Sequence, residues 1–152
     1  MKFQKNLPLT PQQQKGTLIK DYPNGVFKNI SFNKWEWIYQ LQPTEGSPFY
    51  SFKLVYDDIR PRIYILDLLE RVDGHLELPH VWNDKKQEIC LYYPIYQEWT
   101  HYKKISIFVP WVSEWLYYYE LWLVTGTWYG GGIHDSDNSM AKKEKRKKVI
   151  LM

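Results

Sequence analysis

The chain has 152 residues, enough for one domain that buries about two thirds of its unfolded-chain surface. Its single cysteine, Cys90, excludes an intramolecular disulfide, and the start Met1–Pro8 lacks the apolar run of a signal peptide, so we expect a cytoplasmic protein. The formal net charge of +3 is uneven, because Lys142–Lys148 holds six basic residues and one acidic residue. We therefore expect a domain over residues 1–139 and a flexible basic tail over 140–152.

The first predicted element is a helix near the N-terminus. Thr10 is a favourable N-cap, Pro11 suits the first helical position, and Gln13 completes a capping box with Thr10. Pro23 limits the helix, because proline cannot continue the helical hydrogen bonding. We predict a helix that begins at Pro11 and ends before Pro23.

Three stretches with a period of two follow, at Lys34–Leu41, Tyr50–Tyr56 and Arg62–Leu66. In the first two, aromatic and aliphatic residues alternate with more polar ones, which is typical of strands with one buried face. The links between the stretches are short and contain glycine or proline, as in tight turns. The pattern predicts an antiparallel meander.

The most apolar region, Ile105–Gly126, predicts a buried amphipathic helix that Pro110 opens and Gly126 ends. Aromatic residues recur in it at helical spacing and are expected in the core: Trp111, Trp115, Tyr118 and Trp122. A membrane span is excluded, because Glu114 and Glu120 would each cost about 2.5–3.5 kcal/mol near the centre of a bilayer.

Two segments have no regular period. Leu76–Trp99 is interrupted by Pro79 and Pro94, so Cys90 lies in or beside irregular backbone, where functional residues are common. Thr127–Asp135 contains three consecutive glycines but not the spacing of a P-loop or a dinucleotide fingerprint. Metal-binding spacings such as HxxxH, HExxH and CxxC do not occur either, so we expect no metal and no cofactor.

The chemistry of Cys90 depends on whether its thiol is packed or accessible, and the residues alone leave both interpretations open. An unperturbed thiol, with a pKa of about 8.5, exchanges with thioesters without a strong base. Aminolysis of the thioester needs stabilisation of a tetrahedral oxyanion, to which one hydrogen-bond donor contributes about 2.7–4 kcal/mol. His80 and Asn83 precede Cys90 and are the candidates to supply or support that donor.

These residues resemble the active-site segment of ubiquitin-conjugating enzymes. In that family His-Pro-Asn is followed shortly by the catalytic cysteine, often as Ile-Cys-Leu; here Pro79-His80-Val81-Trp82-Asn83 is followed by Ile89-Cys90-Leu91. The order of elements agrees over most of Thr10–Gly126. The resemblance implies an α+β fold: an N-terminal helix, an antiparallel strand meander, an active-site loop and a C-terminal helix.

A closer similarity is to the ubiquitin-conjugating-enzyme-like proteins of bacterial CBASS-type anti-phage defence operons. It rests on Leu78–Val81, Ile89–Pro94, Pro110–Glu120 and Thr125–His134. The resemblance implies a transferase in which Cys90 takes the C-terminal acyl group of a partner as a thioester and passes it to an amine. The implied acyl donor is a cGAS-like nucleotidyltransferase or a ubiquitin-like protein, with a possible separate activating enzyme, since no ATP-binding signature occurs in these residues.

In this comparison His80 orients the loop or assists proton transfer, and His134 supports the site from the glycine-rich segment. His80 follows Pro79 instead of preceding a Pro-Asn pair, so the family's oxyanion asparagine is out of register. Its role is assigned to Asn83 or to backbone N–H groups.

Two other functions stay open at this point. One is a non-catalytic binding module with the same fold, which would hold and regulate a partner through its aromatic surface. The other is nucleic-acid binding through Lys142–Lys148, which is the less favoured of the two.

Overall fold

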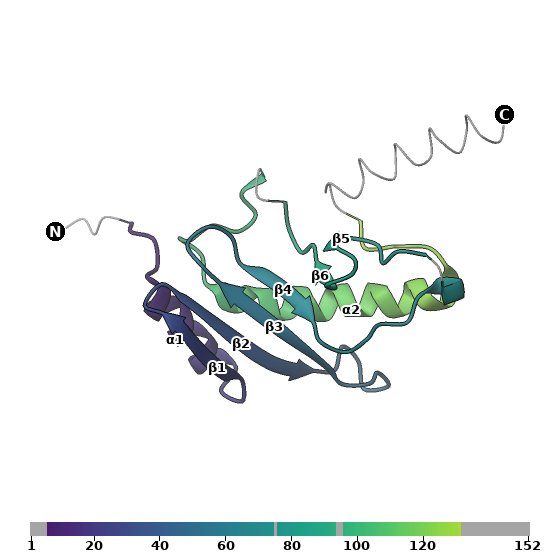
Figure 1. The fold of residues 1–152 in the computed structure, drawn as a ribbon, viewed down its shortest axis with the longest axis horizontal. Coiled ribbons are helices and arrows are strands. Elements are labelled where there is room, and N and C mark those ends of the chain that lie inside the picture. Colours follow the sequence, from purple (N-terminus) through teal and green to yellow (C-terminus); the bar gives the residue numbers. More distant parts are fainter. Residues whose placement is uncertain (1–5, 75, 94–95, 132–152) are drawn as a thin grey trace.

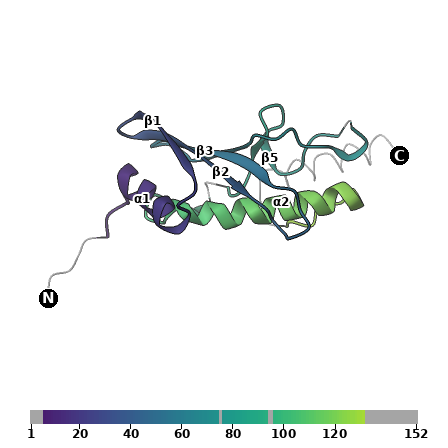
Figure 2. The same cartoon turned by 90° about the horizontal axis from the view of Figure 1, so that it is seen from below.

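The structure is a computed structural model that describes residues 6–74, 76–93 and 96–131. One antiparallel sheet has the strand order β1-β2-β3-β4-β6-β5, and both helices lie on one side of it (Figures 1 and 2). The strands are β1 (Val26–Ser31), β2 (Lys34–Leu41), β3 (Tyr50–Tyr56), β4 (Arg62–Ile65), β5 (Val81–Asn83) and β6 (Glu88–Ile89); the helices are α1 (Pro11–Asp21) and α2 (Phe108–Thr125). The predicted α+β fold is confirmed.

Helix α1 begins as predicted. The Thr10 hydroxyl accepts a hydrogen bond from the Gln13 N–H at 3.1 Å, and the Gln13 side chain accepts one from the Thr10 N–H at 2.9 Å. The fully buried Gln14 then joins α1 to the segment ahead of α2: its amide donates to the Lys103 carbonyl at 2.8 Å and accepts from the Ile105 N–H at 2.7 Å. Both the nitrogen and the oxygen of this buried amide are hydrogen-bonded, so its burial leaves neither atom unsatisfied. Gln14 therefore links α1 firmly to the segment before α2.

The predicted meander is formed by β2, β3 and β4, in which Trp37 lies opposite Leu54 and Leu54 lies opposite Ile63. Alternate residues of these strands form the core against the helices, as the period of two predicts. The buried set on this face is Trp35, Trp37, Tyr50, Phe52, Leu54, Tyr56, Ile63 and Ile65. The opposite face of the same strands carries charged side chains.

Three strands were not predicted. Five of the six residues of β1 are exposed, so this edge strand lacks a buried alternating face. Strands β5 and β6 have three and two residues, which is too short for any period to be visible. Strand β6 nevertheless continues the sheet beside β4, with Ile63 opposite Ile89, and this pairing fixes the position of Cys90.

Helix α2 begins at Phe108, earlier than the predicted start at Pro110, because a 3₁₀ turn (Ile105–Ile107) leads directly into it. Pro110 is tolerated in the first turn, where its missing N–H costs no intrahelical bond. Gly126 ends the helix as predicted, with φ +75° and its N–H on the Trp122 carbonyl. Of the predicted aromatic stripe, Trp115 and Trp122 are buried, while Trp111 and Tyr118 are only partly so.

Within the ranges that the structure describes, no helix is both long and apolar enough to span a membrane. The predicted boundary between domain and tail, at residues 139 and 140, lies outside the described residues, as does the basic segment Lys142–Lys148.

Candidate functional site

Cys90 directly follows β6 and is 5% exposed. Its backbone N–H donates to the carbonyl oxygen of His80 at 2.9 Å, which closes the β5–β6 hairpin at the end next to the cysteine. Its thiol donates a weak hydrogen bond to the Tyr92 carbonyl, with 3.6 Å between sulfur and oxygen. Two of the residues that the sequence singled out, Cys90 and His80, are thus held together by the backbone.

His80 lies between Pro79 and the start of β5 in the left-handed region, with φ +47°. A residue other than glycine costs about 1–3 kcal/mol in such a conformation and keeps it only when its surroundings fix it. Those surroundings are visible: the His80 carbonyl also accepts from Trp115 Nε1 at 3.0 Å, and the imidazole stacks on Trp128 with 4.9 Å between ring centroids. Helix α2 and the segment after it therefore hold the His80 loop in place.

A pocket of about 220 Å³ opens beside Cys90. The described residues that line it are His80, Cys90, Leu91, Glu98, Trp111, Glu114, Trp115, Tyr118, Trp128, Gly130 and Gly131. Four of these carry aromatic side chains of Trp or Tyr, two carry exposed carboxylates, and none is a lysine or an arginine. Such a lining favours a cationic group, which carboxylates attract and aromatic faces stabilise.

The glycine-rich segment forms one wall of this pocket. A Cβ atom at Gly130 would lie 2.5 Å from Trp128 Nε1, and Gly131 has φ +56°. Both positions therefore favour glycine, one for close approach and the other for its backbone conformation. His134, the residue that the sequence predicted to support the site from this segment, lies outside the described residues.

Asn83 lies at the other end of β5 and is exposed. Its side-chain oxygen accepts a hydrogen bond from the Lys86 N–H at 2.9 Å, within the turn that joins β5 to β6. It is not among the residues that line the pocket. Its assignment as an oxyanion donor stays a prediction.

Asp84, next in the turn, supports the segment that leads to His80. Its Oδ1 accepts from the Leu78 N–H at 2.9 Å and forms an ion pair with Arg71. Partial burial raises the pKa of the Asp84 carboxyl, but the hydrogen bonds from Arg71 and Leu78 outweigh it, so the pKa lies below its usual range. The Pro79–His80 corner is therefore anchored by a charged group that stays ionised at neutral pH.

Sequence reasoning missed four residues of the site: Glu98, Glu114, Trp115 and Trp128. The two tryptophans were visible as aromatic residues at helical spacing or in the glycine-rich segment, but their contacts with His80 span 35 and 48 positions of the chain. The two glutamates had no local signal. In the described ranges no group of three or more His, Cys, Asp or Glu side chains could hold a metal ion.

Comparison with known proteins gives one result for this arrangement. No curated protein matches the chain. The family model described as Type II CBASS E2 protein matches residues 14–135. The match includes most of α1, all six strands, the Cys90 pocket and α2. The chain therefore belongs to the family of type II CBASS E2 proteins.

Proposed function

We propose that this E2-like protein carries an acyl group as a thioester on Cys90 and passes it to an amine during CBASS antiviral signalling. In the first step the Cys90 thiolate attacks the carbonyl carbon of an activated C-terminus. A new C–S bond forms, and the former leaving group departs with its electron pair. The observation that carries the proposal is the pocket itself, in which the only cysteine of the chain shares a lining with His80, two carboxylates and four aromatic rings.

In the second step an amine nitrogen attacks the thioester carbonyl, the C–S bond breaks, and Cys90 leaves as a thiolate. The excess proton of the attacking amine passes to solvent or to one of the pocket carboxylates. Glu98 and Glu114 suit this step, because they attract the ammonium form of the acceptor to the pocket and accept hydrogen bonds from it. The ammonium group loses one proton to solvent before its nitrogen attacks. His80 acts as a positioning residue, since its carbonyl holds the Cys90 backbone.

The proposed acyl donor is the C-terminus of a cGAS-like nucleotidyltransferase, with a ubiquitin-like protein as the other candidate. Family membership supports a partner among the CBASS components. A thioester stores free energy that an ordinary carboxylate lacks, so the donor must arrive activated. The proposal therefore includes a separate activating step.

The test is co-expression with the cognate nucleotidyltransferase and with the enzyme that activates its C-terminus, followed by non-reducing gels with and without thiol reductant. We expect a reductant-sensitive adduct with the wild-type chain, a reductant-resistant oxyester adduct with Cys90→Ser, and no adduct with Cys90→Ala. Mass spectrometry of the trapped ester identifies the donor C-terminus. A reductant-sensitive adduct that also forms with Cys90→Ala would show that Cys90 does not carry the acyl group.

A second candidate function is a binding module without catalysis, and the 5% exposure of Cys90 favours it. The rate of thiol alkylation in the folded protein separates the two candidates. If Cys90 reacts with iodoacetamide only as fast as the protein unfolds, it is a packed residue and the binding module is correct. Faster reaction supports the transferase.

A further inference from the structure

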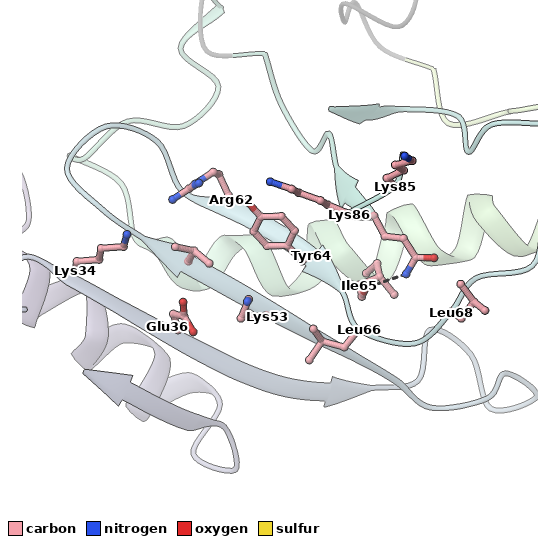
Figure 3. A pocket seen from close by; sticks show the side chains of 12 residues that line it. Lys34, Glu36, Lys53, Arg62, Tyr64, Ile65, Leu66, Leu68, Lys85 and Lys86 are labelled. Carbon is pink, nitrogen blue, oxygen red and sulfur yellow. Dashed lines mark hydrogen bonds between the residues drawn. The ribbon is translucent and has the colours of Figure 1, made fainter. Parts of the chain in front are cut away.

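A second concave surface lies on the face of the sheet away from the helices and encloses about 630 Å³ (Figure 3). We call it the basic groove. Its lining residues come from β2, β3, β4, the segment that follows β4, and the β5–β6 turn: Lys34, Glu36, Lys53, Val55, Arg62, Tyr64, Ile65, Leu66, Leu68, Lys85, Lys86 and Gln87. Five of them are basic and one is acidic. The groove shares no lining residue with the Cys90 pocket.

Strand register brings these cations together. Lys53 lies opposite Tyr64, and Arg62 lies opposite Val55, so all four side chains share the face that the period of two turns away from the core. The Lys53 ammonium lies 5.4 Å from the Tyr64 ring centroid. Figure 3 shows Lys53, Arg62 and Tyr64 on the adjoining strands, with Lys85 and Lys86 on the turn beside them.

Most of this positive charge is not neutralised within the described chain. Arg62 forms an ion pair with Asp57 at 3.1 Å. Among the described residues, no carboxylate forms an ion pair with any of the four lysines of the groove. Lys53 contacts the Tyr64 ring instead of a carboxylate, so the groove keeps most of its positive charge.

We propose that the basic groove docks an acidic segment of another protein, one that carries apolar side chains among its aspartates and glutamates. The lysines complement the acidic residues. At one end of the groove Leu66 is 47% exposed and Leu68 is 91% exposed, and these two side chains offer contact to apolar ones. A surface that combines cations with exposed leucines suits a segment with both characters.

Other occupants fit the groove less well. The C-terminal segment Lys142–Lys148 is basic and would be repelled. Nucleic acid is favoured by unpaired arginines and exposed aromatic platforms, whereas the one arginine here pairs with Asp57, the one aromatic ring lies against Lys53, and Glu36 adds a negative charge. Docking to the basic groove does not require any reaction at Cys90, so the result of its test is independent of the proposed function.

The test is a selection from a displayed library of random short peptides. The wild-type chain is the bait, and the triple variant Lys53→Gln, Lys85→Gln, Lys86→Gln is the counter-bait. A matched control carries Lys20→Gln, Lys28→Gln and Lys104→Gln, which remove the same number of cations, all of them exposed and outside the groove. Thermal unfolding confirms that each variant is folded, and Cys90 alkylation checks that the other pocket is unchanged.

We expect enriched peptides to contain Asp or Glu together with Leu, Ile or Phe. Measured by fluorescence anisotropy, their affinity should fall at least about tenfold in the triple variant, stay within about twofold in the control, and decrease with salt. Enrichment of no acidic peptide, or equal binding to the triple variant, overturns the proposal. Groove-dependent binding of a single-stranded oligonucleotide in place of peptides, or a dimer that the triple variant abolishes, also overturns it by assigning a different occupant.

Discussion

The carbonyl oxygen of His80 accepts two hydrogen bonds, one from the backbone N–H of Cys90 and one from the indole of Trp115. This oxygen therefore connects the segment that bears the cysteine to the middle of α2. The arrangement explains how a residue at φ +47° is kept in its strained conformation next to the candidate nucleophile. It also suggests how the loop can be loosened without touching Cys90.

Replacement of Trp115 by Phe removes the indole N–H while keeping an aromatic side chain. We expect a loss of at least about 1 kcal/mol in the free energy of unfolding, because the hydrogen bond contributes about 1 kcal/mol and the smaller buried ring adds a packing loss, and we expect a change in the alkylation rate of Cys90. Trp99→Phe is the matched control, because the Trp99 indole also donates to a backbone carbonyl, that of Lys104, at 3.2 Å. Urea unfolding should show similar losses for both variants. An unchanged alkylation rate in Trp115→Phe would mean that the bond only stabilises the fold.

Replacement of two glycines by alanine is expected to have different effects: the change at Gly130 should disturb the Cys90 pocket, and the change at Gly16 should stabilise the fold. Gly130→Ala would push against Trp128 and displace the indole that stacks on His80, so we expect altered tryptophan fluorescence and faster alkylation of Cys90. Gly16→Ala lies inside α1 with open space around the new methyl group, and it should stabilise the protein by about 0.5–1 kcal/mol. Thermal unfolding and fluorescence spectra measure both effects. Native fluorescence in Gly130→Ala would contradict the proposed contact.

Asp84 should make the free energy of unfolding depend on pH in the acidic range. Its pKa is lower in the folded than in the unfolded state, so its contribution is present above about pH 4, the ordinary carboxyl pKa, and is lost as the pH falls through the folded value. Asp84→Asn should cost about 1 kcal/mol at pH 7 and show a smaller difference from the wild type in strong acid. Urea unfolding across the pH range measures this.

Asp73→Asn is the control for Asp84, because Asp73 is exposed and its left-handed backbone, with φ +55°, accepts asparagine as well as aspartate. It should leave stability within about 0.5 kcal/mol of the wild type at every pH. A wild-type to Asp84→Asn difference that is independent of pH would refute the role of the Asp84 charge.

The pocket carboxylates should matter for the acceptor amine and not for the acyl donor. Glu98→Gln with Glu114→Gln should leave thioester formation intact and raise the lysine concentration needed for discharge several-fold, since each exposed carboxylate contributes about 0.5–1 kcal/mol. Glu45→Gln, at an exposed turn, is the control. Discharge assays with lysine and with the uncharged amine hydroxylamine separate charge attraction from general damage. Equal slowing with both amines would exclude recognition of the ammonium group.

How far the sequence predicts this protein depends on the range of the interactions involved. The Thr10–Gln13 capping box and the alternation in β2 and β3 are local, and both were predicted correctly. The two-residue strand β6 exists because β4 pairs with it, so no local sequence pattern predicts it. The same holds for the candidate site: the sequence proposes Cys90 and His80 from the single cysteine and the family resemblance, whereas the bond from Trp115 to His80 requires the folded chain.

The last prediction concerns the donor that stabilises the oxyanion. Trp128 Nε1 is buried and has no hydrogen-bond acceptor among the described residues, and Trp128 lines the pocket beside Cys90. A buried N–H without a protein acceptor is costly, so a role in binding the developing negative charge would explain it. Trp128→Phe removes this N–H while keeping an aromatic ring to stack on His80.

We expect Trp128→Phe to form the thioester normally and to slow aminolysis by about 100-fold or more, the usual cost of one oxyanion donor. Asn83→Ala is the comparison, because the sequence makes Asn83 one candidate for the donor, while the structure places it outside the lining of the Cys90 pocket. Single-turnover discharge of the preformed thioester measures both variants. If Asn83→Ala shows the large loss and Trp128→Phe does not, the donor is Asn83, and the β5–β6 turn must rearrange on binding to bring it toward Cys90.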